Sequence, residues 1–404
     1  MGMPIYRPCM ANNPAGTKLG AASHPQILSL EAVPFKGGRS VAKALGHHEG
    51  SLFLDGLKTL TPEVAAALIP HGKWHGTLSL YGLESLTREV ATALAKRNGN
   101  LYLNGVATLT PEVAAALVKH DGRVERTPTL SLNGLKTVAP QVAAALSKHG
   151  GDLHLNGITT LTPEIAAALA KHEGWMRISS DFNIASTLTL DGLATVSDEV
   201  AAKLASHKVK LSMRGLTMLS VKQAECLARH KGDLALDGVK AISPEVAAAL
   251  WNHKSHLILG NMQSLSREVA VELAQHEGSL QLRDLTTLTP EVAEALAKHE
   301  GAELGLRGLT TLNPEAAVAL SNHKGSLSLS DLTTLTPEVA EALAKHEGDL
   351  YLRGLTTLTP EAAAALAQHE GSVYLSGLTT LTRAAAKLLR TNAQIVLPDQ
   401  FKKP

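Results

Sequence analysis

The sequence predicts an α/β solenoid: a right-handed curved stack with a parallel β-sheet on the concave face and α-helices on the convex face. The residues from Asp284 to Gly301 recur letter for letter from Asp331 to Gly348. Looser copies fill most of the chain at a usual step of 23 residues, so one supersecondary unit is repeated. A single copy is too small to bury its own leucines, whereas stacked copies shelter one another.

Each repeat opens with a strand and a turn. The pattern leucine, any residue, leucine, as over 101–103, predicts a short strand with both leucines on one face. Two residues after the second leucine stands glycine, or in some repeats Asn261, Asp284 or Asp331. Because these residue types tolerate positive φ, they predict a tight turn out of the strand. The glycines include Gly56, Gly105, Gly157, Gly215 and Gly354.

The second part of each repeat predicts a helix. Thr110 is a good N-cap, Pro111 suits the first turn, and Glu112 complements the positive helix end. An alanine-rich body follows from Val113 to His120, and a glycine such as Gly122 then ends the helix. Strands lie about 4.8 Å apart and helices about 8 to 10 Å apart. The stack must therefore bend with its strands inside.

The chain divides into three predicted parts. Residues 1–50 form an N-terminal cap and a degenerate first repeat, and residues 51–381 form the solenoid. Residues 382–404 form a C-terminal cap with a final strand over 395–397. Caps are expected because the two ends of a stacked core would otherwise face water.

Composition argues against several kinds of partner. The formal net charge is +1, with basic and acidic residues interspersed, so we expect neither nucleic acid nor a membrane surface as partner. No apolar run approaches the roughly 20 residues of a spanning helix, and the first residues lack a signal-peptide pattern. Cys9 and Cys226 are the two cysteines, which favours a reducing compartment. We expect a cytoplasmic protein.

The repeat motif L-x-L-x-G-L-x-x-L-T-P-E, which ends in A-K-H-E-G, resembles the leucine-rich repeat superfamily over nearly the whole chain. It is similar to a bacterial subclass common in planctomycete-type genomes. In the usual family repeat an asparagine ladder follows the strand, whereas Leu57, Leu83 and Leu135 occupy the nearest matching position here. The resemblance implies a curved solenoid that usually binds proteins, and it brings no catalytic residue and no cofactor.

A histidine stands nineteen residues after the first leucine in thirteen repeats, with Arg97 and Asn392 as exceptions. Two ligands of one zinc ion lie about 3 to 4 Å apart, while packed helices lie about 8 to 10 Å apart. A row of metal sites is therefore a poor fit. We predict instead that each histidine bonds free carbonyls of its helix end and, when protonated, favours the negative helix end.

The sequence offers little support for an enzyme. Cys226 and His230 have the i, i+4 spacing of an activated thiolate pair. Cys226 occupies an alanine position, however, and His230 belongs to the histidine row, so we expect a buried, inert thiol. The chain has no glycine-rich phosphate loop, no H-E-x-x-H and no serine nucleophile elbow. We predict no catalytic residue.

Three insertions lie between a helix end and the next strand; the first holds Trp74, and the longest holds Trp175 and Phe182. Only 3% of the chain is aromatic, so this concentration along one edge of the stack is informative. Two interpretations stay open: the rings fold back over core beneath long loops, or they form a partner-binding edge.

The residue after the second leucine lies on the predicted concave face and is not dictated by the fold. It is mostly acidic or amide in the first half of the chain and rich in arginine in the second half. Arg283 and Arg307 fall on adjacent strands, where like charges repel. Two interpretations stay open: a surface neutralised by Glu303 and Asp349, or a site for an acidic peptide or other anion. The residues of that site are Arg283, Arg307, Tyr351, Arg353 and Tyr374.

These observations predict a non-enzymatic scaffold that binds a protein or peptide on its concave face, assisted by the edge that holds Trp74, Trp175 and Phe182. The alternative is a structural or self-assembling module without a dedicated ligand. The identical repeats near the C-terminus favour that alternative, although recent duplication explains them equally well.

Overall fold

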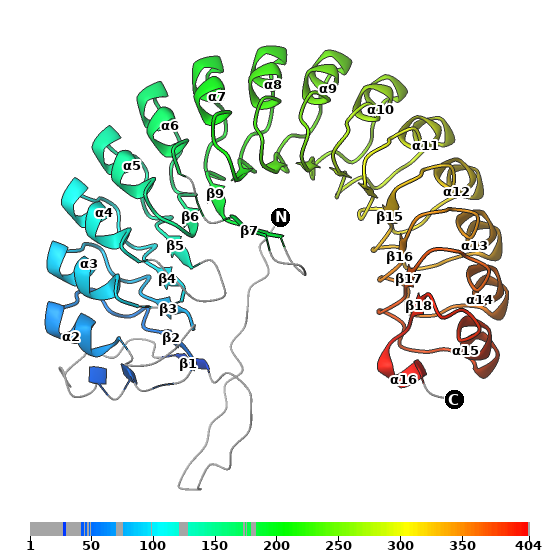
Figure 1. The fold of residues 1–404 in the computed structure, drawn as a ribbon, viewed down its shortest axis with the longest axis horizontal. Coiled ribbons are helices and arrows are strands. Elements are labelled where there is room, and N and C mark those ends of the chain that lie inside the picture. Colours follow the sequence, from blue (N-terminus) through cyan, green and yellow to red (C-terminus); the bar gives the residue numbers. More distant parts are fainter. Residues whose placement is uncertain are drawn as a thin grey trace, which may run out of the picture.

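The repeats stack into an arc. The computed structural model describes residues 27–29, 42–43, 45–46, 48, 50–69, 76–97, 99–120, 128–172, 174, 176–178 and 183–402. The strands line the inside of the arc and the helices form its outside (Figure 1). Parallel strands that alternate with helices confirm the predicted α/β solenoid.

One sheet runs through the stack, and each of its strands is two or three residues long. Its sixteen strands follow chain order, and each pairs in parallel with the next. The first leucine of one repeat pairs with the first leucine of the next, as Leu257 does with Leu280. The strands are β1 (Ile27–Ser29), β2 (Ser51–Phe53), β3 (Leu78–Ser79), β4 (Leu101–Tyr102), β5 (Thr129–Ser131), β6 (Asp152–His154), β9 (Thr187–Thr189), β10 (Lys210–Ser212), β11 (Leu234–Ala235), β12 (Leu257–Ile258), β13 (Leu280–Gln281), β14 (Glu303–Gly305), β15 (Ser326–Ser328), β16 (Leu350–Tyr351), β17 (Val373–Tyr374) and β18 (Ile395–Val396).

The helices on the outside are short, mostly seven residues, and are capped as the sequence predicts. In α4, for example, the Thr110 side chain accepts a hydrogen bond from the Val113 amide, and Pro111 occupies the first turn. The helices are α2 (Pro62–Ala67), α3 (Arg88–Leu94), α4 (Pro111–Leu117), α5 (Pro140–Leu146), α6 (Pro163–Leu169), α7 (Asp198–Leu204), α8 (Val221–Leu227), α9 (Pro244–Leu250), α10 (Arg267–Leu273), α11 (Pro290–Leu296), α12 (Pro314–Leu320), α13 (Pro337–Leu343), α14 (Pro360–Leu366), α15 (Arg383–Leu389) and α16 (Asp399–Lys402).

The helix body is shorter than predicted. Helix α4 ends at Leu117 rather than at His120. The His120 amide donates to the Leu117 carbonyl oxygen, three residues back, so the last residues form a tighter turn. The histidine thus follows the helix instead of lying in its last turn.

A continuous core runs the length of the arc. Both strand leucines of a repeat face it, and Leu101 and Leu103 are each 0% exposed. The apolar helix positions, such as Val113 and Leu117, close the same core from the outside. Full burial of a leucine side chain contributes about 1.5 to 3 kcal/mol, so the repeated leucine pairs are the main source of stability.

The glycine after each strand does not adopt the predicted positive φ. Among the described glycines, positive φ occurs at Gly99 and Gly174 only. At Gly105, instead, an added Cβ would overlap the carbonyl oxygens of Tyr81 and Leu83 in the preceding repeat. Glycine is needed there because two turns of backbone touch, so the positive-φ interpretation was wrong. The same overlap occurs at Gly82, Gly134, Gly157, Gly192, Gly215 and Gly238.

The last repeat is closed by a short C-terminal segment. Strand β18 ends the sheet, and α16 folds back so that Arg390 Nε donates to the Phe401 carbonyl oxygen at 2.8 Å. Gln400 Nε2 bonds the Leu378 carbonyl oxygen at 3.2 Å. Within the described residues, no helix is long and apolar enough to cross a membrane.

The longest insertion contains a β-hairpin that the sequence did not predict. Strands β7 (Met176–Ile178) and β8 (Asn183–Ala185) pair antiparallel, and β7 lies on the inner side of the arc (Figure 1). Trp74, Trp175 and Phe182 lie outside the described residues, so the proposed loop edge stays a prediction.

Candidate functional site on the concave face

Three rows of side chains cover the inside of the arc. On each strand, the residues before, between and after the two leucines point away from the core, because alternate residues of a strand share a face. We call them the first, middle and last rows. On β16 they are Asp349, Tyr351 and Arg353.

In the first half of the arc, the last row is a structural ladder. Asn133 Oδ1 accepts a hydrogen bond from the Asn156 amide at 2.9 Å, and Asn156 Oδ1 accepts one from the Asp191 amide at 3.1 Å. Each side chain thus satisfies a backbone donor of the next strand. The ladder residues are Asp55, Asn104, Asn133, Asn156 and Asp191.

Middle-row serines support the ladder. Ser131 Oγ donates to Asn104 Oδ1 at 2.7 Å, and Ser212 Oγ donates to Asp191 Oδ1 at 2.6 Å. This ladder lies one residue after the second leucine, whereas Leu57, Leu83 and Leu135 at the position of the family's asparagine ladder are buried in the core. The acidic and amide side chains of the last row therefore stabilise the sheet by bonding backbone amides of the next strand.

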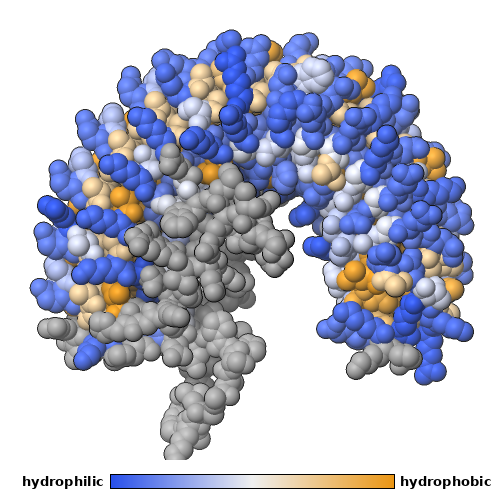
Figure 2. Space-filling model, in the orientation of Figure 1, coloured by the Kyte–Doolittle hydropathy of each residue, from blue (hydrophilic) through white to orange (hydrophobic). Residues whose placement is uncertain are grey.

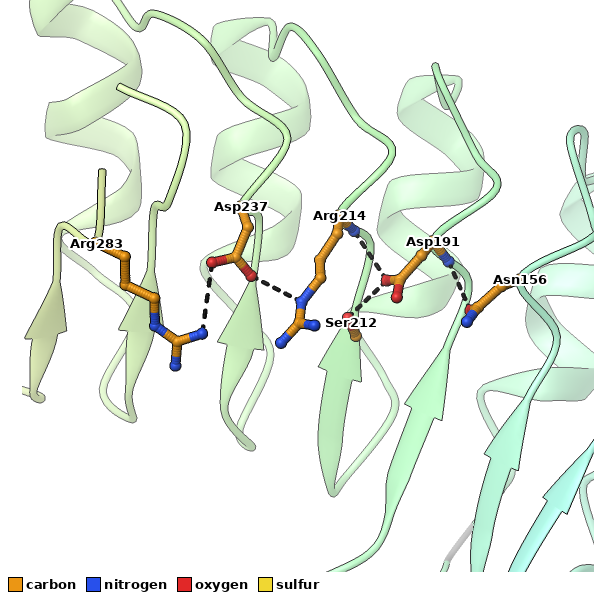
Figure 3. Close-up of polar contacts among 6 residues, drawn as sticks. All are labelled: Asn156, Asp191, Ser212, Arg214, Asp237 and Arg283. Atoms are coloured by element: carbon orange, nitrogen blue, oxygen red, sulfur yellow. Dashed lines mark hydrogen bonds and ion pairs between the residues drawn. The ribbon is translucent and has the colours of Figure 1, made fainter. Parts of the chain in front are cut away.

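The ladder ends at Arg214, where ion pairs begin. The Arg214 amide donates to Asp191 Oδ1 at 3.0 Å, and Arg214 Nε donates to Asp237 Oδ2 at 2.9 Å (Figure 3). An Nη atom of Arg283 lies 3.7 Å from the other oxygen of Asp237. Gly260, on the strand between them, has no side chain to block this contact, and an added Cβ would overlap Asp237. Asp237 therefore forms ion pairs with both Arg214 and Arg283.

Two stacked tyrosines occupy the C-terminal part of the middle row. The rings of Tyr351 and Tyr374 lie 4.5 Å apart with an interplanar angle of 6°. Arg353 Cζ lies 5.1 Å from the centre of the first ring and 5.7 Å from that of the second. The Arg353 guanidinium therefore contacts both rings. Cation–π contact of this kind contributes roughly 0.5 to 1 kcal/mol at an exposed site.

The structure separates the predicted site residues into two groups. Tyr351, Arg353 and Tyr374 contact one another, whereas Arg283 belongs to the ion pairs with Asp237. Three strand steps, or about 14 Å, separate Arg283 from Arg353. Arg307 lies on β14 between the groups and is exposed. The predicted anion site is therefore not a single cluster.

The sequence did not single out Tyr81 and Tyr102, two tyrosines on the concave face of the first half. Tyr81, in the last row, is 49% exposed. Burial, followed by the nearby Tyr81 and Asp152, raises the pKa of the middle-row Tyr102. The signal was present in the sequence as Tyr81 among acidic and amide residues, where a ladder side chain is otherwise found.

The histidine row closes each repeat. His172 Nε2 lies 3.0 Å from the Gly151 carbonyl oxygen, two residues before the first leucine of the same repeat. Since a carbonyl only accepts, Nε2 carries the hydrogen. Equivalent bonds join His149, His253, His276, His299 and His369 to the matching carbonyl. The predicted partner, a carbonyl at the end of the histidine's own helix, was wrong for these bonds.

The rings of this row are buried and stacked. Neighbouring ring centres lie 5.5 Å apart for His299 and His323 and 6.2 Å apart for His346 and His369. Burial, reinforced by neighbouring histidines, lowers the pKa of His149 and His207 to about 3. Burial also lowers the pKa of His230, His276, His299 and His346 to about 4. These imidazoles are neutral at pH 7, so the predicted stabilisation by a charged histidine was wrong for them.

Both exceptions in the row donate hydrogen bonds to backbone carbonyl oxygens. An Nη atom of Arg97 donates to the Gly76 carbonyl oxygen at 3.1 Å, the position that a histidine would reach. Asn392 Nδ2 donates to the carbonyl oxygens of Ala367 and His369 at 3.2 and 2.7 Å. Arg97 therefore makes the contact of the bonded histidines, whereas Asn392 bonds carbonyls at the helix end of the preceding repeat.

Other candidate chemistry finds no support in the geometry. Cys226 is buried in the core, as expected of an inert thiol. Among the described residues, no three His, Cys, Asp or Glu side chains are placed to hold a metal ion. A charged recess between α11 and α12, lined by Glu294, Lys298 and Lys324, lies on the helix side of the arc, away from the concave face.

Comparison with known proteins returns similarity of fold only. No family model and no curated protein matches the sequence. An LRR protein of Leptospira interrogans is 21% identical, with 91% of this chain and 88% of that chain covered and a TM-score of 0.41. The chain is similar to solved leucine-rich repeat proteins.

Two further solved structures are similar to this leucine-rich-repeat-like solenoid. An internalin from Listeria monocytogenes is 17% identical, with 89% of this chain and 94% of that chain covered and a TM-score of 0.37. A chain of the Toll–Spatzle complex from Drosophila is 13% identical, with 92% and 54% covered and a TM-score of 0.42. At these identities the likeness concerns the fold alone.

Proposed function

We propose that this chain is a non-enzymatic scaffold that binds a protein or peptide on the C-terminal part of its concave face. One observation carries the proposal: the ladder of last-row side chains that accept backbone amides ends at Arg214, and the described concave rows from β14 onward do not resume it in the last row. They present Arg307, Arg353 and the Tyr351–Tyr374 pair instead. Arginine and tyrosine are enriched among the residues that dominate binding energy at protein interfaces.

The experiment is capture of partners from a lysate of the source organism, with the partners identified by mass spectrometry. The chain with Tyr351→Ala and Tyr374→Ala should lose a partner that the unaltered chain retains. Tyr81→Ala removes an exposed tyrosine from the other half of the same face and is the matched control. A partner that the double variant retains in full, while its circular dichroism shows intact folding, would contradict the proposed surface.

The finer parts of the proposal follow from the sequence. The use of cysteine and the resemblance of the repeat wording support a bacterial, cytoplasmic protein of the planctomycete-type subclass. The near-neutral charge supports a protein or peptide rather than nucleic acid or a membrane as partner. Trp74, Trp175 and Phe182 are proposed to extend the contact along the loop edge.

A second candidate function, self-assembly, is favoured by the end of the sheet. Strand β18 is the last strand, its Val396 is 41% exposed, and hydrophobic side chains gather at the inner edge of this end (Figure 2). Exposed edge strands readily pair with other chains. Gel filtration over a range of concentrations tests this candidate. Assembly that grows with concentration and stops in Val396→Lys would support it, and a single concentration-independent species would exclude it.

A further inference from the structure

Strands β14 and β16 carry the same charge pattern on the concave face. Glu303 and Asp349 stand in the first row, and Arg307 and Arg353 stand in the last row. The leucines between them are buried in the core, so each acid and its arginine point to the same side of the sheet. Four residues of a strand span about 13 Å. Each strand therefore presents a negative and a positive edge about that far apart.

The strand between them carries no long side chain. Strand β15 lies between β14 and β16 and has serine in all three rows. Ser328 is buried, and its Oγ lies 3.3 Å from Ser330 Oγ. Ser326 and Ser330 are half-buried. A partner backbone laid along β15 would meet hydroxyl groups beneath it and charged groups on both sides.

The charged groups of β14 and β16 lie close enough to Tyr351 to shift the pKa of its hydroxyl. Burial and the adjacent Tyr374 raise the pKa of its hydroxyl, and Asp349 and Glu303 raise it further. Arg353 acts in the opposite direction, and its Cζ lies 5.1 Å from the ring centre. The acids of both strands and one arginine thus act on a single side chain. Glu303, Asp349 and Arg353 therefore contribute to one electrostatic environment around Tyr351.

A simple anion fits this field poorly. An acidic ligand long enough to cross the sheet would meet the arginines at one edge and the carboxylates at the other. A segment with opposite charges at its two ends is attracted at both edges and repelled at neither. In an extended chain, residues i and i+4 are about 13 Å apart and point the same way. In a helix they are only about 6 Å apart.

We propose that the face over β14–β16 binds an extended partner segment in which a basic and an acidic residue stand four positions apart. The basic residue faces Glu303 and Asp349, and the acidic residue faces Arg307 and Arg353. The residue midway between them contacts Tyr351. This inference rests on the proposed function, because it names the chemistry of the partner at the same surface.

Three synthetic peptides test the charge pattern. The first is acetyl-Thr-Lys-Val-Tyr-Val-Glu-Thr-amide; the second has glutamate at both charged positions, and the third has lysine at both. Titrated into the full chain by calorimetry at low salt, the mixed-charge peptide should bind at least about threefold more tightly than either other peptide. The difference should shrink at ~1 M salt, where the Debye length is about 3 Å. Tighter binding of the doubly acidic peptide would overturn the inference in favour of an anion site.

Charge reversal on the protein is a further test. A misfolded variant would lose binding to all three peptides, whereas the proposal predicts a change in which peptide binds most tightly. Arg307→Glu with Arg353→Glu makes both edges acidic, so the doubly lysine peptide should become the tightest binder. Arg267→Glu reverses one charge at the start of α10, outside the concave face, and should leave the preference unaltered. An unaltered preference in the double variant would overturn the inference.

The outcome also distinguishes this inference from the proposed function. If none of the three peptides binds the unaltered chain, the inference fails. Capture of a partner that depends on Tyr351 and Tyr374 would still support the proposed concave surface. A captured partner that is indifferent to those tyrosines and also to the arginine reversal would remove both.

Discussion

At the scale of the residue, the glycine after each strand shows how one repeat constrains the next. Gly105 lies directly over backbone carbonyls of the preceding repeat, and the overlap that a side chain would cause recurs along the stack. The backbone itself is ordinary at this position, since Gly105 does not adopt positive φ. Contact between turns, and not local conformation, therefore selects glycine there.

Gly105→Ala should lower the free energy of unfolding by about 1 to 3 kcal/mol, as is typical when side-chain volume is forced into a packed site. Gly105→Asn should be at least as harmful, because its tolerance of positive φ is of no use here. Urea denaturation followed by circular dichroism measures both. Asparagine restoring stability relative to alanine would show instead that backbone conformation is the constraint.

The last-row ladder shows that an Asn or Asp on the concave face can have a structural role. An Asn or Asp on the concave face could bind a partner or hold the neighbouring strand, and both roles select the same residue types. The sequence did not separate them, although the recurrence of asparagine at Asn104, Asn133 and Asn156 in consecutive repeats was the available signal. Partner-specific residues would be expected to vary between repeats.

At the scale of the element, the helices are too short to be stable alone. Helices of seven residues form few internal hydrogen bonds, and isolated helices below about 12 to 15 residues are marginal in water. Their caps and their packing on the leucine core must therefore hold them. Helix α5 lacks one of these supports, because Ala139 stands at its N-cap and offers no side-chain acceptor.

Ala139→Thr should raise the free energy of unfolding by about 1 kcal/mol, because the new hydroxyl would accept the free amide of the first turn. The reverse change in the preceding repeat, Thr110→Ala at the N-cap of α4, should lower it by a similar amount. Thermal and urea unfolding of the two variants measure the pair. No gain from Ala139→Thr, combined with a clear loss from Thr110→Ala, would show that α5 is capped in another way.

At the scale of the whole molecule, the architecture was predictable and the fine contacts were not. Alternating leucines predict burial on one face whatever their neighbours are, so Leu101 and Leu103 sufficed to place a strand in the core. Sequence spacing did not show that Arg283 lies beside Asp237, because it does not show which charges are already paired. Asp237 reaches Arg283 across Gly260, a contact that depends on the missing side chain of the strand between them.

The histidine row couples the stability of the whole arc to pH. The imidazoles whose pKa burial lowers are neutral in the folded chain at pH 7, whereas an unfolded histidine has a pKa near 6.5. Burial lowers the pKa of six of them to about 3 or 4. Between those values and about 6.5 the unfolded chain binds protons that the folded chain does not. This contribution to stability is complete above pH ~6.5 and is lost as the pH falls towards 4.

Urea unfolding midpoints measured between pH 7 and 5 should therefore fall with acidification, in a range above the ordinary titration of carboxylates. Each buried histidine in the cooperative unit should add up to about 1.4 kcal/mol per pH unit to the slope. His276→Asn with His299→Asn, which copies the native Asn392 of the last repeat, should reduce that slope by up to about 3 kcal/mol per pH unit, whatever it does to stability at pH 7. A midpoint that is constant across this range, or a slope that the double substitution does not change, would show that these histidines accept protons inside the folded arc.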